Sequence, residues 1–199
     1  MCIRDRYGMS KIAEEMFALQ LGKRYKIPTV AMRYSIVQGS RQSFYNAYSG
    51  ACRIFSLAFH QGKEPQIYED GNQVRDFVNI HDVVDANLLV LEDERADYEM
   101  FNVGGGAPVT VNQFASACAK IYGIKNYQPK PSGKYRFGDT RHIWSDISKL
   151  ESLGWKPSRT IYDSIIEYKE WLDCASSIDN IIEYCSKKME ELNVLRDVS

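Results

Sequence analysis

The sequence predicts an α/β protein. Residues 7–25 carry apolar side chains at helical spacing, and they are followed directly by a β-branched run at 29–37 that is typical of a buried strand. Further short strands alternate with helical patterns along the chain, which favours helices layered on a sheet. The 199 residues, 44% of them hydrophobic, suffice for a sizeable core in one large domain or in parts of two.

The individual elements follow from local patterns. After residue 37 the sequence predicts a helix at 48–60, strands at 66–68, 74–80 and 100–103, helices from 82 and 110, a short helix at 146–154, and helices from 160 and in the tail after 175. Asp82 is expected to cap the helix that carries Val83, Val84, Leu88 and Leu91. Thr110 and Gln113 match a capping box.

Composition excludes several classes of function. The formal net charge of −1 gives no bulk attraction to nucleic acid or to acidic membranes, and the apolar runs are too short to span a bilayer. Five scattered cysteines without a C-x-x-C motif fit a reducing cytoplasm. The three histidines are equally scattered, so no metal site is expected.

The stretch Tyr7-Gly-Met-Ser-Lys11 places a phenol and an ammonium on one helical face. An ammonium at that distance favours the phenolate, which could accept a proton from a substrate hydroxyl. The alternative is an ordinary solvated helix surface. Two basic segments are further candidates: Val74-Arg-Asp-Phe-Val78, whose guanidinium suits a phosphate, and residues 134–142. The alternative for both is solvated charge. Gly104-Gly-Gly fails the phosphate-loop spacing and is interpreted as a flexible connection.

In their order, the motifs of this chain resemble the extended short-chain dehydrogenase/reductase family, specifically its NAD-dependent nucleotide-sugar epimerases and dehydratases. The matching segments are Tyr7-Gly-Met-Ser-Lys11, Met32-Arg-Tyr34, Ile67-Tyr-Glu-Asp-Gly71, Val74-Arg-Asp-Phe-Val78, Phe101-Asn-Val-Gly-Gly105 and Leu153-Gly-Trp-Lys-Pro157. Asn46-Ala-Tyr-Ser-Gly50 and Gly133-Lys-Tyr-Arg136 particularly resemble dTDP-L-rhamnose 4-epimerase-like members. Within the family, the chain is most similar to dTDP-L-rhamnose 4-epimerase-like or UDP-glucose 4-epimerase-like members.

This resemblance implies the C-terminal part of a Rossmann-type doubly wound parallel sheet plus a smaller α/β substrate-binding domain. Residues 1–45 would be a remnant of the NAD-binding domain, with the catalytic helix and the strand after it. Residues 46–174 would be mainly the substrate-binding domain, with a segment around 66–103 returning to the Rossmann sheet. Residues 175–199 would be a helical tail outside the resemblance.

The resemblance also implies roles for individual residues. Tyr7 is the expected base and Lys11 the expected ligand of the nicotinamide ribose; Tyr34 and Ser35 are expected beside the nicotinamide of NAD. The implied substrate-binding residues are Arg75 and Arg136 at the diphosphate, Arg141 near them, Gln66 and Tyr68 at the base, and Asn46 and Asn102 as polar contacts. Ile36 departs from the family, which often has Asn there.

The expected function is NAD-dependent epimerisation of a nucleotide-linked sugar, at C4, through a transient keto-sugar. The 199 residues lack the family's Gly-rich loop and its catalytic Ser/Thr, so we expect an N-terminally truncated chain that is inactive alone and binds NAD poorly. A homodimer is expected for the full-length protein. The alternatives are a 4,6-dehydratase of the same family, a non-catalytic nucleotide-sugar-binding protein, and one half of a split enzyme.

Overall fold

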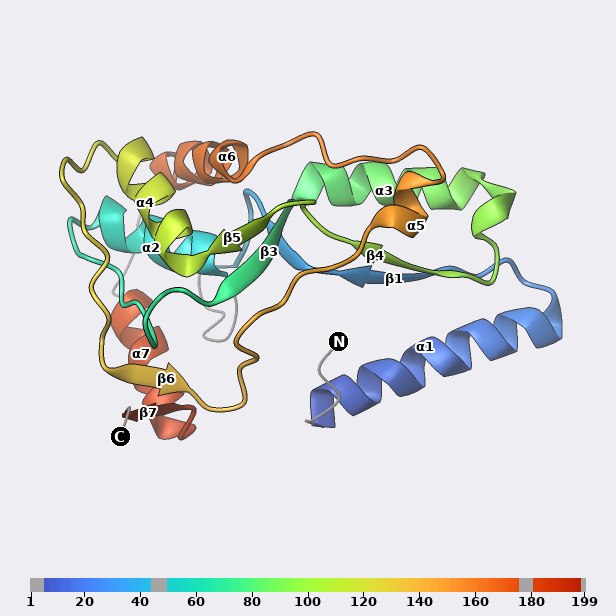
Figure 1. Cartoon of the computed structure of the whole chain (residues 1–199), viewed down its shortest axis with the longest axis horizontal. Coiled ribbons are helices and arrows are strands. Elements are labelled where there is room, and N and C mark those ends of the chain that lie inside the picture. Colours follow the sequence, from blue (N-terminus) through green and yellow to red (C-terminus); the bar gives the residue numbers. More distant parts are fainter. Residues whose placement is uncertain (1–5, 44–49, 176–180, 198–199) are drawn as a thin grey trace.

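The computed structural model describes residues 6–43, 50–175 and 181–197, and it confirms the α/β class (Figure 1). The helices are α1 (Arg6–Tyr25), α2 (Ala51–His60), α3 (Ile80–Glu92), the 3-10 turn η1 (Glu94–Ala96), α4 (Val111–Ile121), α5 (Ser148–Glu151), α6 (Ile161–Asp173) and α7 (Ile181–Glu191). The strands are β1 (Ala31–Tyr34), β2 (Ile36–Gln38), β3 (Val74–Asn79), β4 (Met100–Val103), β5 (Pro108–Thr110), β6 (Lys134–Arg136) and β7 (Leu195–Asp197).

Within the described parts of the chain, the strands form three small sheets. β1 pairs in parallel with β4, with Met32 opposite Phe101. β2 pairs in parallel with β3, and β3 pairs on its other edge with antiparallel β5. β6 and β7 form an antiparallel pair. The parallel pairs are joined by long connections that contain helices, as parallel strands require.

The single strand predicted at 29–37 is wrong, because the chain changes sheet at Ser35. Tyr34 ends β1 and Ile36 begins β2, and the two strands have different partners. The Ser35 backbone N–H donates to Val103 at 2.9 Å, which ends the pairing with β4. Its hydroxyl donates to the buried carboxylate of Asp76 on β3 at 2.7 Å. The β-branched run was identified correctly, but a polar side chain at its centre divides it.

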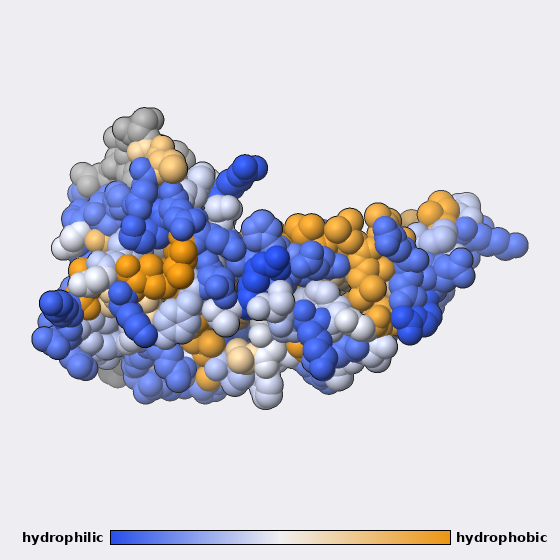
Figure 2. Space-filling view, turned by 90° about the horizontal axis from the view of Figure 1, so that it is seen from above, coloured by the Kyte–Doolittle hydropathy of each residue, from blue (hydrophilic) through white to orange (hydrophobic). Residues whose placement is uncertain are grey.

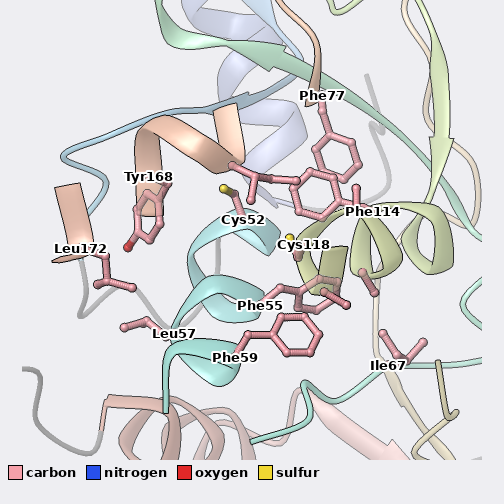
Figure 3. Close-up of a cluster of buried hydrophobic side chains, with 14 of the residues drawn as sticks. Cys52, Phe55, Leu57, Phe59, Ile67, Phe77, Phe114, Cys118, Tyr168 and Leu172 are labelled. Carbon is pink, nitrogen blue, oxygen red and sulfur yellow. The ribbon is translucent and has the colours of Figure 1, made fainter. Parts of the chain in front are cut away.

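Two hydrophobic clusters support the two halves of the molecule. The larger one joins α2, α4, α6, α7 and β3, and its rings meet at Phe77 and Phe114, whose centroids are 4.3 Å apart (Figure 3). The smaller one lies between α3 and the β1–β4 pair, and it includes Val90, Phe101 and Leu150. Figure 1 shows the α1, β1, β4 and α3 half beside the α2, α4, α6 and α7 half along the long axis.

Helix α3 begins before its predicted cap. Asn79 caps the helix by accepting from the His81 backbone N–H at 2.8 Å, so the prediction that Asp82 is the cap is wrong. The buried Asp82 carboxylate instead accepts from Ser158 and Arg159 in the loop before α6. Asp82 therefore links α3 to a segment more than seventy residues away.

The apolar residues of α3 lie on two faces. Val83 and Val90 are buried, whereas Val84, Leu88 and Leu91 are exposed on the other face. Figure 2, seen from above the view of Figure 1, shows hydrophobic side chains gathered over the half of the molecule that contains this helix. Helix α1 is similar, since only Leu19 of its predicted apolar stripe is buried. None of the described helices is long and apolar enough to cross a membrane.

Among the remaining elements, the helix cap predicted from local patterns is confirmed, whereas the short strands are mostly missed. The capping box of Thr110 and Gln113 is confirmed, and Thr160 caps α6 in the same way with Asp163. The strand predicted at 66–68 is only an isolated bridge between Ile67 and Pro131. The connection after Gly104 contains β5, which was not predicted; neither were β6 and β7. These three strands have three residues each and carry no long apolar pattern.

Candidate functional site

A cavity of about 510 Å³ lies between β3, α2, the segment before β3, β6 and α7. Four of the residues predicted to bind substrate line it: Gln66, Tyr68, Arg75 and Arg136. They come from three separate segments of the chain, and apolar side chains of α2, β3 and α7 form a large part of the remaining wall. A more open hollow beside Gly105 and Trp144 contains none of the predicted residues. Polar groups converging in a largely apolar cavity are typical of a small-molecule site.

Arg75 is held in the wall of this cavity by several contacts. Its side chain is only 12% exposed, and its Nη1 donates to the carbonyls of Val74 and Arg141 at 2.9 and 2.8 Å. Its Nη2 lies 3.5 Å from the Asp139 carboxylate. Burial is the main cause that lowers the pKa of Arg75, and the nearby charge of Arg136 lowers it further, against the opposing effect of Asp139 and Glu69. An anion bound beside this guanidinium would stabilise its charged form and so oppose the lowering of its pKa.

Arg136 is carried by β6, next to Tyr68. The backbone N–H of Glu69 donates to the Lys134 carbonyl at 2.8 Å, which holds the segment with Tyr68 alongside β6. Burial raises the pKa of the Tyr68 hydroxyl, and the positive charge of Arg136 partly offsets this. Tyr68 therefore stays a neutral phenol near neutral pH. Its ring is available for stacking, and its hydroxyl can donate a hydrogen bond at the edge of the ring.

Arg141 does not line the cavity but supports it from outside. Its guanidinium forms ion pairs with Glu69 and Asp70 at 2.8 and 2.7 Å. The hydrogen bond from Arg141 and, to a smaller extent, that from the Asn72 backbone N–H lower the pKa of Asp70 to about 2. Because its carbonyl accepts from Arg75, Arg141 connects the loop after β6 with the turn before β3 and with the cavity cation.

Tyr7 and Lys11 share one face at the start of α1, as the spacing requires. The Lys11 Nζ lies 5.7 Å from the centroid of the Tyr7 ring, and it also donates to Glu14 at 2.7 Å. That hydrogen bond is the main cause that raises the pKa of Lys11. Tyr7 is exposed and lies in the first turn of α1. Figure 1 shows that this end of α1 is the one closer to the half of the molecule that contains the cavity.

The other predicted residues lie outside the cavity. Tyr34 is at the end of β1, where its hydroxyl donates to Asn87 of α3 at 2.9 Å. Ser35 follows it and contacts Asp76 and Ser145. Both are at the carboxyl end of a parallel strand, the edge at which such sheets bind ligands. Asn102 of β4 donates to the Asp146 carbonyl at 2.9 Å. Asn46 lies outside the described residues.

Sequence reasoning missed several residues that line the cavity. Arg53 is fully buried in α2, although the segment around it is apolar, and a charge inside such a run was an available signal. Lys63 and Asp139 also line the cavity, but both read as ordinary loop charges. Cys185, Ser186 and Met189 of α7 complete the wall and carried no sequence signal beyond helical spacing.

Comparison with known proteins identifies the relatives of this fold. The model of the NAD dependent epimerase/dehydratase family matches residues 3–104, about half of the chain. The chain belongs to the NAD dependent epimerase/dehydratase family. This match includes the Tyr7–Lys11 pair, both parallel strand pairs and Arg75.

Members of this family provide the individual similarities. The chain is 35% identical over 167 residues to a dTDP-L-rhamnose 4-epimerase from Burkholderia thailandensis, covering 83% of this chain and 46% of that protein. The crystal structure of a UDP-glucose 4-epimerase from Thermotoga maritima with UDP-glucose has a TM-score of 0.75 and 35% identity, over 84% of this chain and 53% of that chain. A UDP-glucuronic acid 4-epimerase from Bacillus cereus, in complex with UDP-glucuronic acid and NAD, has a TM-score of 0.71 and 26% identity, over 84% and 52%. The chain spans about half the length of the curated relatives it matches.

Proposed function

We propose that this chain forms the nucleotide-sugar-binding part of an NAD-dependent epimerase that inverts C4 of the sugar through a transient keto-sugar. The activity belongs to a longer enzyme. Within the chain, residues 1–45 belong to the NAD-binding domain, 46–174 mainly to the substrate-binding domain, with 66–103 returning to the Rossmann sheet, and 175–199 to a tail. The longer enzyme would act as a cytoplasmic homodimer without nucleic acid partners, and size-exclusion chromatography with light scattering tests that assembly.

One observation carries this proposal most directly. Arg75 on β3 and Arg136 on β6 are sixty-one residues apart in the sequence, and they line the same cavity as Tyr68. Two guanidiniums beside an aromatic ring suit a ligand with adjacent phosphates and a planar base. The similar proteins of known structure were crystallised with UDP-sugars, which supports this ligand class.

Tyr7 and Lys11 fit a nicotinamide nucleotide and a sugar hydroxyl. An exposed phenol with an ammonium 5.7 Å from its ring supplies a proton acceptor and a cation on one helical face. Lys11 would hold the ribose, and Tyr7 would take the proton from the C4 hydroxyl as the carbonyl forms. Bound NAD supplies the hydride acceptor. After the keto-sugar has turned its other face, return of the same hydride to C4 and of the proton from Tyr7 to the C4 oxygen would complete the inversion.

A 4,6-dehydratase is the second candidate in the same family. The similar proteins with at least 25% identity described above are named as 4-epimerases, which favours epimerisation. The products separate the two, since a dehydratase releases a 4-keto-6-deoxy-sugar whereas an epimerase releases an isomer of equal mass. Mass spectrometry and sugar analysis of the product therefore decide between them.

The binding part of the proposal is tested on the 199 residues themselves. Isothermal titration calorimetry with UDP and dTDP should detect binding, and Arg75→Ala and Arg136→Ala should each weaken it by about tenfold or more. Arg24→Ala, which removes an exposed arginine on α1, is the matched control and should have no effect. Equal affinity in all three variants would exclude a diphosphate at this cavity.

The catalytic part is tested in a longer protein that contains this chain. Tyr7→Phe removes the proton acceptor and keeps the ring, so turnover should fall by about a hundredfold or more while nucleotide-sugar affinity stays unchanged. A non-catalytic binding protein shows no turnover before the substitution. Full turnover after it would assign the proton transfer to another residue.

A further inference from the structure

The tail segment formed by α7 and β7, Ile181–Asp197, contributes directly to the cavity. Cys185, Ser186 and Met189 of α7 line the same space as Arg75 and Arg136. The segment is far beyond residues 3–104, on which the family assignment rests. Figure 1 shows it beside β6 at one end of the molecule.

Helix α7 is held against the cavity by one buried face. Ile181, Cys185 and Met189 are four residues apart, and each is no more than 3% exposed within the larger hydrophobic cluster. Tyr68 packs against the same cluster. The buried Arg53 of α2 donates from Nη1 to the Cys185 sulfur at 3.6 Å. The cluster therefore brings the apolar face of α7 next to the ring that is proposed to contact the base.

Strand β7 fixes the strand that carries Arg136. In the antiparallel pair, Arg136 is opposite Leu195. The Phe137 backbone N–H donates to Val194 at 2.9 Å, and Lys134 pairs with Glu190 at 3.3 Å. The guanidinium of Arg196 lies 3.8 Å from the centroid of the Phe137 ring. β6 has three residues, so much of its backbone pairing comes from the tail.

We propose that the α7–β7 segment is the specificity-determining wall at the base end of the nucleotide-sugar pocket. Cys185 and Met189 provide apolar surface beside Tyr68, and the half-buried Ser186 limits the size of the base that fits. The diphosphate end, at Arg75 and Arg136, is chemically separate. This inference rests on the proposed function, because it states which segment contacts the base of the nucleotide sugar that the proposed function names.

The first test adds bulk inside and outside the pocket. Ser186→Trp fills the base end, and Lys187→Trp adds the same side chain to the next, exposed residue as a matched control. Calorimetry on the full 199-residue chain compares UDP with inorganic pyrophosphate, which carries the phosphates without the base. Ser186→Trp should weaken UDP binding by about tenfold or more and leave pyrophosphate binding within about twofold, whereas Lys187→Trp should change neither.

The outcomes separate this inference from the proposed function. Unchanged UDP affinity in Ser186→Trp, or equal losses for UDP and pyrophosphate, overturns the base wall while the pocket itself stands. Absence of UDP and dTDP binding in the unmodified chain overturns the proposed function and the wall with it.

A second pair of variants protects the test against misfolding. Met189→Ala removes buried surface from the wall, and Leu192→Ala, at an exposed position just after α7, is its control. Thermal unfolding verifies that both variants still unfold cooperatively. Met189→Ala should weaken UDP binding by about threefold to tenfold with pyrophosphate binding retained. An unchanged UDP affinity in a folded Met189→Ala variant contradicts the assignment.

Discussion

The carboxylate of Asp76 and the hydroxyl of Ser35 form a hydrogen bond of 2.7 Å at the point where the chain passes from one sheet to the next. Asp76 is fully buried, and it also accepts from the backbone N–H groups of Gly105 and Ser145 at 2.7 and 3.2 Å. Its neighbour Arg75 faces the cavity instead. Adjacent charges on one strand are thus separated by the alternation of its side chains.

Replacing Asp76 by Ala should destabilise the protein strongly. The change leaves buried N–H donors without an acceptor, and each such group costs about 1–3 kcal/mol, so we expect a loss of about 3 kcal/mol in the free energy of unfolding. Urea unfolding followed by circular dichroism measures it. Asp85→Asn, which removes an exposed ion pair with Arg159, should cost less than about 1 kcal/mol. Similar midpoints for the two variants would show that the Asp76 hydrogen bonds contribute little.

Gly105 should tolerate no side chain. A Cβ at this position would collide with the Phe77 carbonyl of β3, a backbone atom that cannot move alone. Gly105→Ala should therefore lower stability by about 2 kcal/mol or more. Gly123→Ala, at a positive φ but with open space around it, should cost about 1 kcal/mol from backbone strain alone. Differential scanning calorimetry compares them, and equal melting temperatures would contradict the proposed clash.

Glu15 should control how firmly α1 is attached to the sheet. Its carboxylate accepts from the Arg33 Nε and Nη2 at 2.6 Å each, and few apolar residues of α1 are buried. The hydrogen bonds from Arg33 lower the pKa of Glu15. Glu15→Gln should speed amide hydrogen exchange throughout α1 while β4 keeps its protection. Glu14→Gln is the matched control, since Glu14 is exposed and its ion pair is with Lys11 on the same helix. Identical exchange in both variants would assign the attachment to packing instead.

The Asp70–Arg141 ion pair predicts a specific acid dependence. Because the folded-state pKa of Asp70 lies at about 2, below its ordinary value, the contribution of the pair is present above about pH 4 and is lost as the pH falls toward 2. Arg141→Gln should move the Asp70 titration, followed by NMR of the carboxyl carbon, up toward about 4. Arg24→Gln should not move it. An unshifted titration in Arg141→Gln would mean that the Asn72 backbone N–H dominates.

Local patterns predicted the fold class and most of the helices, because apolar spacing and caps such as Thr110 act within a few residues. They failed where distant contacts decide the outcome. The division at Ser35 depends on Asp76, forty-one residues away, and the burial of Asp82 depends on the loop before α6.

The cavity illustrates the same limit. Motif resemblance indicates Gln66 and Tyr68, and the basic segments that contain Arg75 and Arg136 also stand out by their chemistry. No spacing rule could show that these residues meet. Cys185 and Met189 follow an ordinary helical pattern, so the sequence gives them the appearance of core residues only. Their position beside the cavity depends on the packing of α7 against α2 within the larger hydrophobic cluster, which is a tertiary property.

Among the described residues, β1 has β4 as its sole strand neighbour, so no strand pairs with its other edge. Such an edge accepts a foreign strand readily. Purified at high concentration, the 199-residue chain should therefore self-associate through this edge. A proline or lysine introduced along β1 should reduce this association.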